Sequence, residues 1–288
     1  MQDQSSGGPD FAPQEGPGPV GQPGQPGQPG QLGQPGQPGQ PGQPGQSGSV
    51  AQPGPARNPA PGRPGPPGPV DIARRWFRDV PVTTGITAAL LAVWLVCALQ
   101  ARSITATGGA PLARAWMLWG PELLTGLGPL RALGFMFVHM DASHVLLNGL
   151  MTLFIGREIE RAYGSGVFAA AWLISGLGSA LAVLMLDPLA PTGGASGAVY
   201  GLMAVLVGLA AKNKADLRAP LALVGVNIVY TLIAANVSLW GHLGGLAAGA
   251  VVALLLVTRR PGLRWAGFVA ALTAVVAALA GYVVTGGY

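Results

Sequence analysis

The chain has 288 residues, of which 50% are hydrophobic and only 9% are charged, whereas a soluble domain carries about 25% charged residues. This composition argues against an ordinary soluble domain and favours a chain folded in a lipid bilayer. The net charge of +5 does not indicate nucleic acid as a partner, because the basic residues flank apolar runs and form no stripe with aromatic residues. The single cysteine, Cys97, lies in an apolar run, so no internal disulfide is expected.

Residues 1–70 differ in composition from the rest of the chain and hold 19 of the 27 prolines. From Gly21, nine consecutive triplets begin with Gly-Gln, and seven of them are Gly-Gln-Pro. Glycine at every third position also permits a short collagen-like helix, but the run is brief and ends abruptly, which favours a disordered tether. No charged start followed by an apolar core opens the chain, so we expect no secretory signal and assign this tail to the cytoplasm.

The membrane domain is expected over residues 71–288, and its predicted fold class is an all-α polytopic membrane protein. A helix needs about 20 residues to cross the hydrocarbon layer. On that measure the apolar runs predict seven spans: 82–100, 142–161, 165–186, 196–212, 217–236, 242–258 and 265–285. The second and fourth spans carry polar residues at one end, and such groups must find partners inside a helix bundle.

The basic residues predict how these spans are oriented in a cell membrane. With the N-terminus in the cytoplasm, thirteen of the 16 lysines and arginines fall on the inner side and three on the outer side. Seven spans then place the C-terminus outside. The Arg74-Arg75 pair fits the inner group better than a twin-arginine export signal. The outer segment 101–141 holds Trp116 and Trp119 and is expected to lie partly in the membrane interface.

Polar residues suited to chemistry lie at the start of three predicted spans. His144 and Asn148 are four residues apart and share one helix face in the second span. Ser196 opens the fourth span, and His242 opens the sixth. By the orientation above, all four groups lie at one depth near the outer surface.

This combination is suited to nucleophilic acyl transfer. A serine hydroxyl needs a base to take its proton, and a neutral imidazole is the usual base. Free backbone N–H groups at the start of the fourth span, with the side chains of Asn148 and His144, could stabilise an oxyanion. No Asp or Glu lies in the fourth, fifth or sixth span, so another group must hold the histidine, and Tyr200 could stack against it. The alternative is that Ser196 only packs or bonds within its own helix.

Glycines recur at every fourth residue on two of the spans, namely Gly197 and Gly201 on the fourth and Gly241, Gly245 and Gly249 on the sixth. Such faces of small residues allow helices to approach closely in lipid. We expect the two faces to pack together and to bring Ser196 within about 3 Å of His242.

Together these motifs resemble those of the rhomboid family of intramembrane serine proteases, in its bacterial form. The matching segments are, in chain order, His139, the His144–Asn148 pair, Gly156, Glu160 and Gly164, then Gly194-Ala195-Ser196-Gly197 with Tyr200, and Gly241-His242 with Gly245 and Gly249. The resemblance covers roughly residues 80–260, and the motifs follow the family's order. The family often has Trp-Arg and then Thr ahead of the histidines. This chain has Leu130-Arg131-Ala132 instead, which puts in question how the outer loop is anchored.

The resemblance implies a six-helix bundle with a seventh C-terminal helix. It also implies a serine endopeptidase that cleaves transmembrane segments of membrane-anchored proteins. The implied roles are catalytic for Ser196 and His242, oxyanion binding for His144, Asn148 and Ser196, and supporting for Tyr200, His139, Gly194, Gly197 and Gly245. His139 is expected to tie the outer loop to the second span, and the fifth span to act as a lateral gate. The lipid bilayer is the other partner, no cofactor or metal is implied, and no oligomeric state is indicated.

Two other classes of function stay open from the sequence. A non-catalytic protein of the same fold would bind transmembrane segments without cutting them, although the intact Ser196 and His242 argue against it. A small transporter or channel could instead use the polar cavity. Ion-coupled carriers usually show matched interrupted helices and a buried carboxylate relay, and the sequence carries neither. A metalloprotease is disfavoured because no His-Glu-x-x-His occurs. Glu160 is expected to pair with Arg157 or Arg161 in a structural role.

Overall fold

The computed structural model of the chain describes residues 68–235 and 237–286. The chain divides into two units, Met1–Arg63 and Pro64–Tyr288. Of the tail predicted over residues 1–70, only residues 68–70 belong to the described part. Within the described residues there is no strand, and the single β-type pairing is an isolated bridge between Leu118 and Thr192. The all-α fold class predicted for the membrane domain is therefore confirmed.

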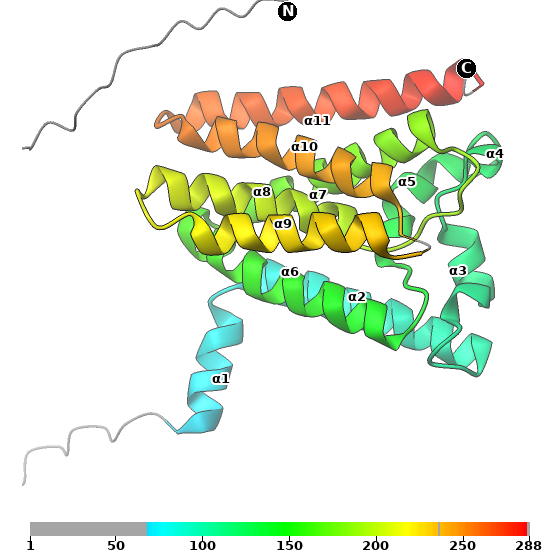
Figure 1. Ribbon diagram of the computed structural model, residues 1–288, viewed down its shortest axis with the longest axis horizontal. Helices are drawn as coiled ribbons and strands as arrows, with labels where there is room; N and C mark the ends of the chain where they lie inside the picture. Colours follow the sequence, from blue (N-terminus) through cyan, green and yellow to red (C-terminus); the bar gives the residue numbers. More distant parts are fainter. Residues whose placement is uncertain (1–67, 236, 287–288) are drawn as a thin grey trace, which may run out of the picture. The chain divides into compact units, whose positions relative to one another are not determined.

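One amphipathic helix and seven longer helices build the fold (Figure 1). They are α1 (Pro69–Arg78), α2 (Pro81–Ala101), α6 (Ala142–Tyr163), α7 (Ser165–Leu186), α8 (Ser196–Lys212), α9 (Arg218–Ile233), α10 (Leu239–Val257) and α11 (Pro261–Val284). Each of the seven predicted spans corresponds to one helix from α2 onward, with ends that agree within a few residues.

Local sequence signals set several of these boundaries. Pro81 and Pro261 stand in the first turns of α2 and α11. A backbone N–H at these positions has no acceptor within the helix, so proline, which lacks the N–H, loses no hydrogen bond there. Asp141 and Ser238 cap α6 and α10, because each side chain accepts a hydrogen bond from the backbone N–H three residues on, at 2.9 and 3.1 Å. The caps fix the start of the two helices that carry His144 and His242.

Among the described residues, four helices, α2, α7, α10 and α11, are long and apolar enough to cross a membrane, so the chain is a multi-pass membrane protein. The α8 and α9 helices are apolar but have only 17 and 16 residues. A helix of that length measures about 25 Å, less than the roughly 30 Å of hydrocarbon. Because α8 ends at the charged Lys212, we expect its first residue, Ser196, to lie below the opposite membrane surface.

The core is centred on α8, which packs against α6, α7 and α10. The buried apolar side chains of the core include Phe135, Ile159, Phe168, Leu202 and Met203. The α7 helix is buried on most sides, whereas α11 packs on α7 and α10 and leaves most of its surface outward. The seventh helix thus adds to the outside of the bundle rather than to its centre.

The two predicted glycine faces of α8 and α10 pack on each other. A Cβ atom added at Gly245 would collide with the backbone of Gly197, and one added at Gly249 would collide with the backbone of Gly201. A Cβ atom added at Gly197 would collide with the side chain of Ser179 on α7. The helices therefore meet backbone to backbone, as small residues permit in lipid, and the predicted packing is confirmed.

Glu160 links three helices, but not through the predicted arginine. Its carboxylate accepts hydrogen bonds from the backbone N–H groups of Val82 and Thr83, at 3.1 and 2.7 Å, and from the Ser165 hydroxyl at 2.5 Å. The first N–H groups of α2 have no partner within their own helix, and a carboxylate satisfies them well. Arg157 instead lies 3.7 Å from Glu158, so the expectation that Glu160 pairs with Arg157 or Arg161 was wrong.

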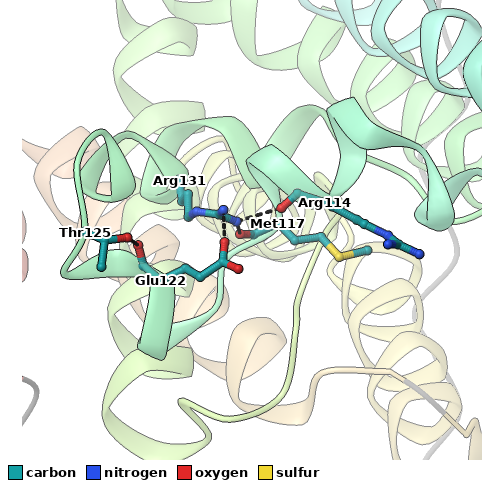
Figure 2. A network of polar contacts seen from close by, with 5 residues as sticks. All are labelled: Arg114, Met117, Glu122, Thr125 and Arg131. Carbon is teal, nitrogen blue, oxygen red and sulfur yellow. Dashed lines mark hydrogen bonds and ion pairs between the residues drawn. The ribbon is translucent and has the colours of Figure 1, made fainter.

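The segment between α2 and α6 contains short helical turns held together by Arg131. The turns are η1 (Thr107–Gly109), α3 (Pro111–Trp116), α4 (Gly120–Leu123), η2 (Gly128–Leu130), α5 (Arg131–Gly134) and η3 (Phe135–Phe137). Figure 2 shows the Arg131 guanidinium donating to the backbone carbonyls of Arg114 and Met117, each at 2.8 Å, and forming an ion pair with Glu122. This arginine, without the tryptophan and threonine of the rhomboid pattern, joins the ends of α3, α4 and α5.

Candidate active site

The segment that precedes Ser196 is fixed by the loop between α2 and α6. Leu118 and Thr192 exchange two backbone hydrogen bonds of 2.9 Å, and the Gly194 N–H donates to the Phe135 carbonyl at 2.8 Å. Gly194 has a φ of 135°, a backbone conformation that residues other than glycine rarely adopt. The loop thus delivers Ser196 to the first position of α8.

Ser196 and His242 are in direct contact. Nε2 of His242 lies 2.8 Å from Oγ of Ser196, which is the separation that the glycine faces were expected to produce. His242 is buried with 6% of its surface exposed, and it stands in the first turn of α10. The backbones of Gly197 and Gly245 meet next to this pair, which keeps α8 and α10 close together at the site.

Two groups hold the imidazole of His242. The predicted stacking of Tyr200 is present, with ring centroids 4.1 Å apart and planes inclined by 12°. The second group was missed from the sequence: Oγ1 of Thr231, on α9, lies 2.7 Å from Nδ1 of His242. A threonine in an apolar helix usually bonds the carbonyl four residues back, and Thr231 also does this with Asn227. Its sequence context therefore gives no sign of the second contact.

His144 and Asn148 lie in the first two turns of α6, and His144 borders Ser196. A Cβ atom at Gly194 would lie 2.8 Å from Nε2 of His144 and 3.7 Å from Oγ of Ser196, so both atoms border the same space. Asn148 is 5% exposed, and its amide donates to the His144 carbonyl at 3.0 Å. An amide group carries two N–H donors, and this bond uses one of them.

His139 is fully buried and connects the loop to the serine segment. Its Nδ1 lies 3.2 Å from the Phe137 carbonyl, and its Nε2 accepts a hydrogen bond from the Ala195 N–H at 3.4 Å. The ring also meets that of His144 edge to face, with centroids 4.9 Å apart. His139 thus ties the loop between α2 and α6 to the start of α8 by hydrogen bonds, and it touches the second predicted span, α6, by ring packing.

The site contains all three histidines but no cluster of ligands for a metal. In the part of the chain that the structure describes, no group of three or more His, Cys, Asp or Glu side chains could hold an ion. Asp141, the carboxylate nearest in sequence to His139 and His144, lies just ahead of α6. The Ser143 hydroxyl and the His144 backbone N–H donate to its carboxylate and hold the pKa of that carboxyl below the usual value. It stays ionised as a helix cap.

In comparison with known proteins, residues 128–259 match the family model of the rhomboid domain. The chain is 32% identical over 127 residues to rhomboid protease GluP of Bacillus subtilis, covering 41% of this chain and 24% of that protein. It is 26% identical over 130 residues to RHOMBOID-like protein 1 of Arabidopsis thaliana, covering 43% of this chain and 33% of that protein. It is 25% identical over 175 residues to Rhomboid-like protease 3 of Toxoplasma gondii, covering 57% and 65%.

The chain thus spans about a quarter to a third of the length of the first two relatives. These relatives come from a bacterium, a plant and Toxoplasma, so they do not narrow the source to bacteria. The matched region begins in η2 and ends just after α10, and it contains every predicted site residue.

Proposed function

We propose, from the match of residues 128–259 to the rhomboid domain, that this chain belongs to the rhomboid family and is an intramembrane serine endopeptidase. In this proposal a Ser196–His242 dyad cleaves transmembrane segments of membrane-anchored proteins. The observation that carries the proposal is the 2.8 Å contact between Nε2 of His242 and Oγ of Ser196, at the start of a helix and within a bundle of apolar helices. A hydroxyl and an imidazole at this separation are ready for proton transfer.

The reaction proceeds in two stages. His242 takes the Ser196 proton through Nε2 while Oγ bonds to the scissile carbonyl carbon, and the imidazolium then donates that proton to the departing amine as the C–N bond breaks. In the second stage His242 takes a proton from water, whose oxygen attacks the acyl carbon. The ester bond to Oγ breaks, and the proton returns to Ser196.

The developing oxyanion is stabilised by groups around Ser196. The backbone N–H of Ser196 stands at the start of α8, where helix N–H groups have no partner in their own helix. Nε2 of His144 borders the same space as Oγ of Ser196, and Asn148 supplies an amide from the same face of α6. Donors placed in advance around the reacting atom are worth several kcal/mol of barrier, about 3 for a single donor.

Substrates reach the site from the side and as extended chain. An intact helix hides its carbonyls in hydrogen bonds, so segments with helix-weakening residues near the outer membrane surface are preferred. The orientation that the basic residues predict, with the N-terminus inside and the C-terminus outside, opens the site to the outer face. The α9 helix is the proposed gate, because Thr231 is its one buried residue.

Labelling with a fluorophosphonate tests the dyad. The purified chain in detergent is expected to react covalently, and Ser196→Ala and His242→Ala are expected not to. Ser103→Ala is the matched control, since Ser103 is partly exposed in a turn after α2 and its hydroxyl bonds only within that turn. Equal labelling of all four proteins would refute an activated Ser196. A wild-type chain that binds transmembrane segments but is never labelled would favour the non-catalytic alternative.

A further inference from the structure

The α9 helix packs loosely on the rest of the bundle, where Leu223 and Val224 contact the core but stay partly exposed. Of its 16 residues, Thr231 alone is buried, with 6% of its surface exposed. Large apolar side chains point outward along its length, namely Leu221, Val226, Val229, Tyr230, Leu232 and Ile233. The helix runs along α8 (Figure 1), and its one buried side chain lies against the candidate active site.

The Thr231 hydroxyl joins three helices. Its Oγ1 contacts Nδ1 of His242 on α10 at 2.7 Å and the hydroxyl of Tyr200 on α8, and it donates to the Asn227 carbonyl at 2.9 Å. Tyr200 also donates to the Asn227 carbonyl. The two groups that hold the imidazole, one by stacking and one by hydrogen bonding, are therefore themselves connected.

The proton positions in this cluster are consistent with one tautomer of His242. Because Nε2 must accept the Ser196 proton, the ring proton of the neutral imidazole lies on Nδ1. Nδ1–H then donates to Oγ1 of Thr231, whose own hydrogen is directed to the Asn227 carbonyl. The Thr231 hydroxyl and both ring nitrogens of His242 then have hydrogen-bond partners, and the ring is held with Nε2 toward Ser196.

We propose that Thr231 is a positioning residue for His242, in the place where serine hydrolases usually have a carboxylate. This inference rests on the proposed dyad. The hydroxyl selects the Nδ1–H tautomer and the ring orientation without adding a negative charge to an apolar site. Because Thr231 belongs to α9, the orientation of the base depends on where that helix lies.

Two substitutions at Thr231 separate its hydroxyl from its shape. Thr231→Val keeps the volume and removes the hydrogen bond, and Thr231→Ser keeps the hydroxyl. The expected result is labelling by a fluorophosphonate about tenfold slower for Thr231→Val, and within about twofold of wild type for Thr231→Ser. Thr152→Val is the matched control, because Thr152 is fully buried on α6 and its hydroxyl has no hydrogen-bond partner in the described structure.

A second measurement does not require catalysis. In the ¹⁵N-histidine NMR spectrum only three residues contribute, and the His242 signals are identified by their loss in His242→Ala. The Nδ1–H resonance is expected to shift in Thr231→Val and to stay in Thr231→Ser and Thr152→Val. Unchanged resonance and rate in Thr231→Val would overturn the positioning role and leave the dyad intact. A shifted resonance in a chain that is never labelled would support the positioning role and refute the proposed protease.

Discussion

The contact of α8 with α10 and the contact of α9 with both are of opposite kinds. The first is made by glycine backbones that would collide with any added side chain. In the second, Thr231 is the one buried residue of α9, and Leu223 and Val224 contact the core but stay partly exposed. The Ser196–His242 distance depends on the rigid contact, and the orientation of the imidazole depends on the weaker one. The site thus combines a fixed contact with a weaker one, and in the proposed function an incoming segment would displace the weaker one.

The largest effect is expected from widening the rigid contact. In Gly245→Val the new side chain would meet the Gly197 backbone, and the helices must separate by more than the reacting atoms tolerate. A displacement of about 1 Å can cost about 100-fold in rate, so fluorophosphonate labelling should fall by at least that factor.

Gly225→Val on α9 is the matched control, because a Cβ atom there has nothing within 4 Å. It should be labelled within about twofold of wild type, as surface changes rarely disturb a site. If Gly245→Val retained normal labelling, or if both variants lost it equally, the contrast between the two contacts would not hold.

A smaller effect is expected at Glu160, which joins α2, α6 and α7 away from the site. Glu160→Gln replaces an ionised acceptor by an amide that cannot accept through both atoms. The free energy of unfolding should fall by about 2–3 kcal/mol, measured by reversible unfolding in mixed detergent. The labelling rate of the protein that remains folded should be near that of wild type.

Glu158→Gln provides the comparison for this change, since the Glu158 side chain is 60% exposed and its nearest basic partner is 3.7 Å away. It should cost less than about 0.5 kcal/mol. A cost at Glu158 as large as at Glu160 would show that charge, rather than the bonds to the N–H groups of α2, determines the effect.

The smallest loss of stability is expected in the loop between α2 and α6. Arg131→Met removes the hydrogen bonds to two carbonyls and the ion pair with Glu122 (Figure 2). The loop holds the serine segment, so labelling should slow by less than about tenfold, with a loss of about 1–2 kcal/mol in unfolding free energy.

Arg114→Met is the control here, because Arg114 contributes only its backbone carbonyl to the network. That variant should behave as wild type in both measurements. An Arg131→Met protein that loses labelling completely would place the loop in the rigid part of the site.

Periodic patterns in the sequence predicted the helices and the main contact of the site. Seven apolar runs corresponded to seven helices, and the spacing of Gly197, Gly201, Gly245 and Gly249 predicted which faces meet. Both patterns work because close helix packing requires small residues at regular intervals. The stacking of Tyr200 on His242 followed from its place one turn after the serine.

The polar partners were not predictable in the same way. Glu160 binds backbone N–H groups of another helix, and backbone donors leave no mark in a sequence. Thr231 was missed because its side chain satisfies its own helix and a distant imidazole at once. Identifying such contacts requires the rotation of one helix against another, which a hydroxyl in an apolar run does not encode.

The backbone contact between Gly197 and Gly245 has a consequence for the response to lipid. Side chains that face hydrocarbon repack when bilayer thickness changes, and helices tilt to match it, but a backbone contact has no side chain to rearrange. We therefore expect thinner or thicker bilayers to change how readily α9 tilts and admits a segment. They should leave the Ser196–His242 separation, and with it the chemical step, unchanged.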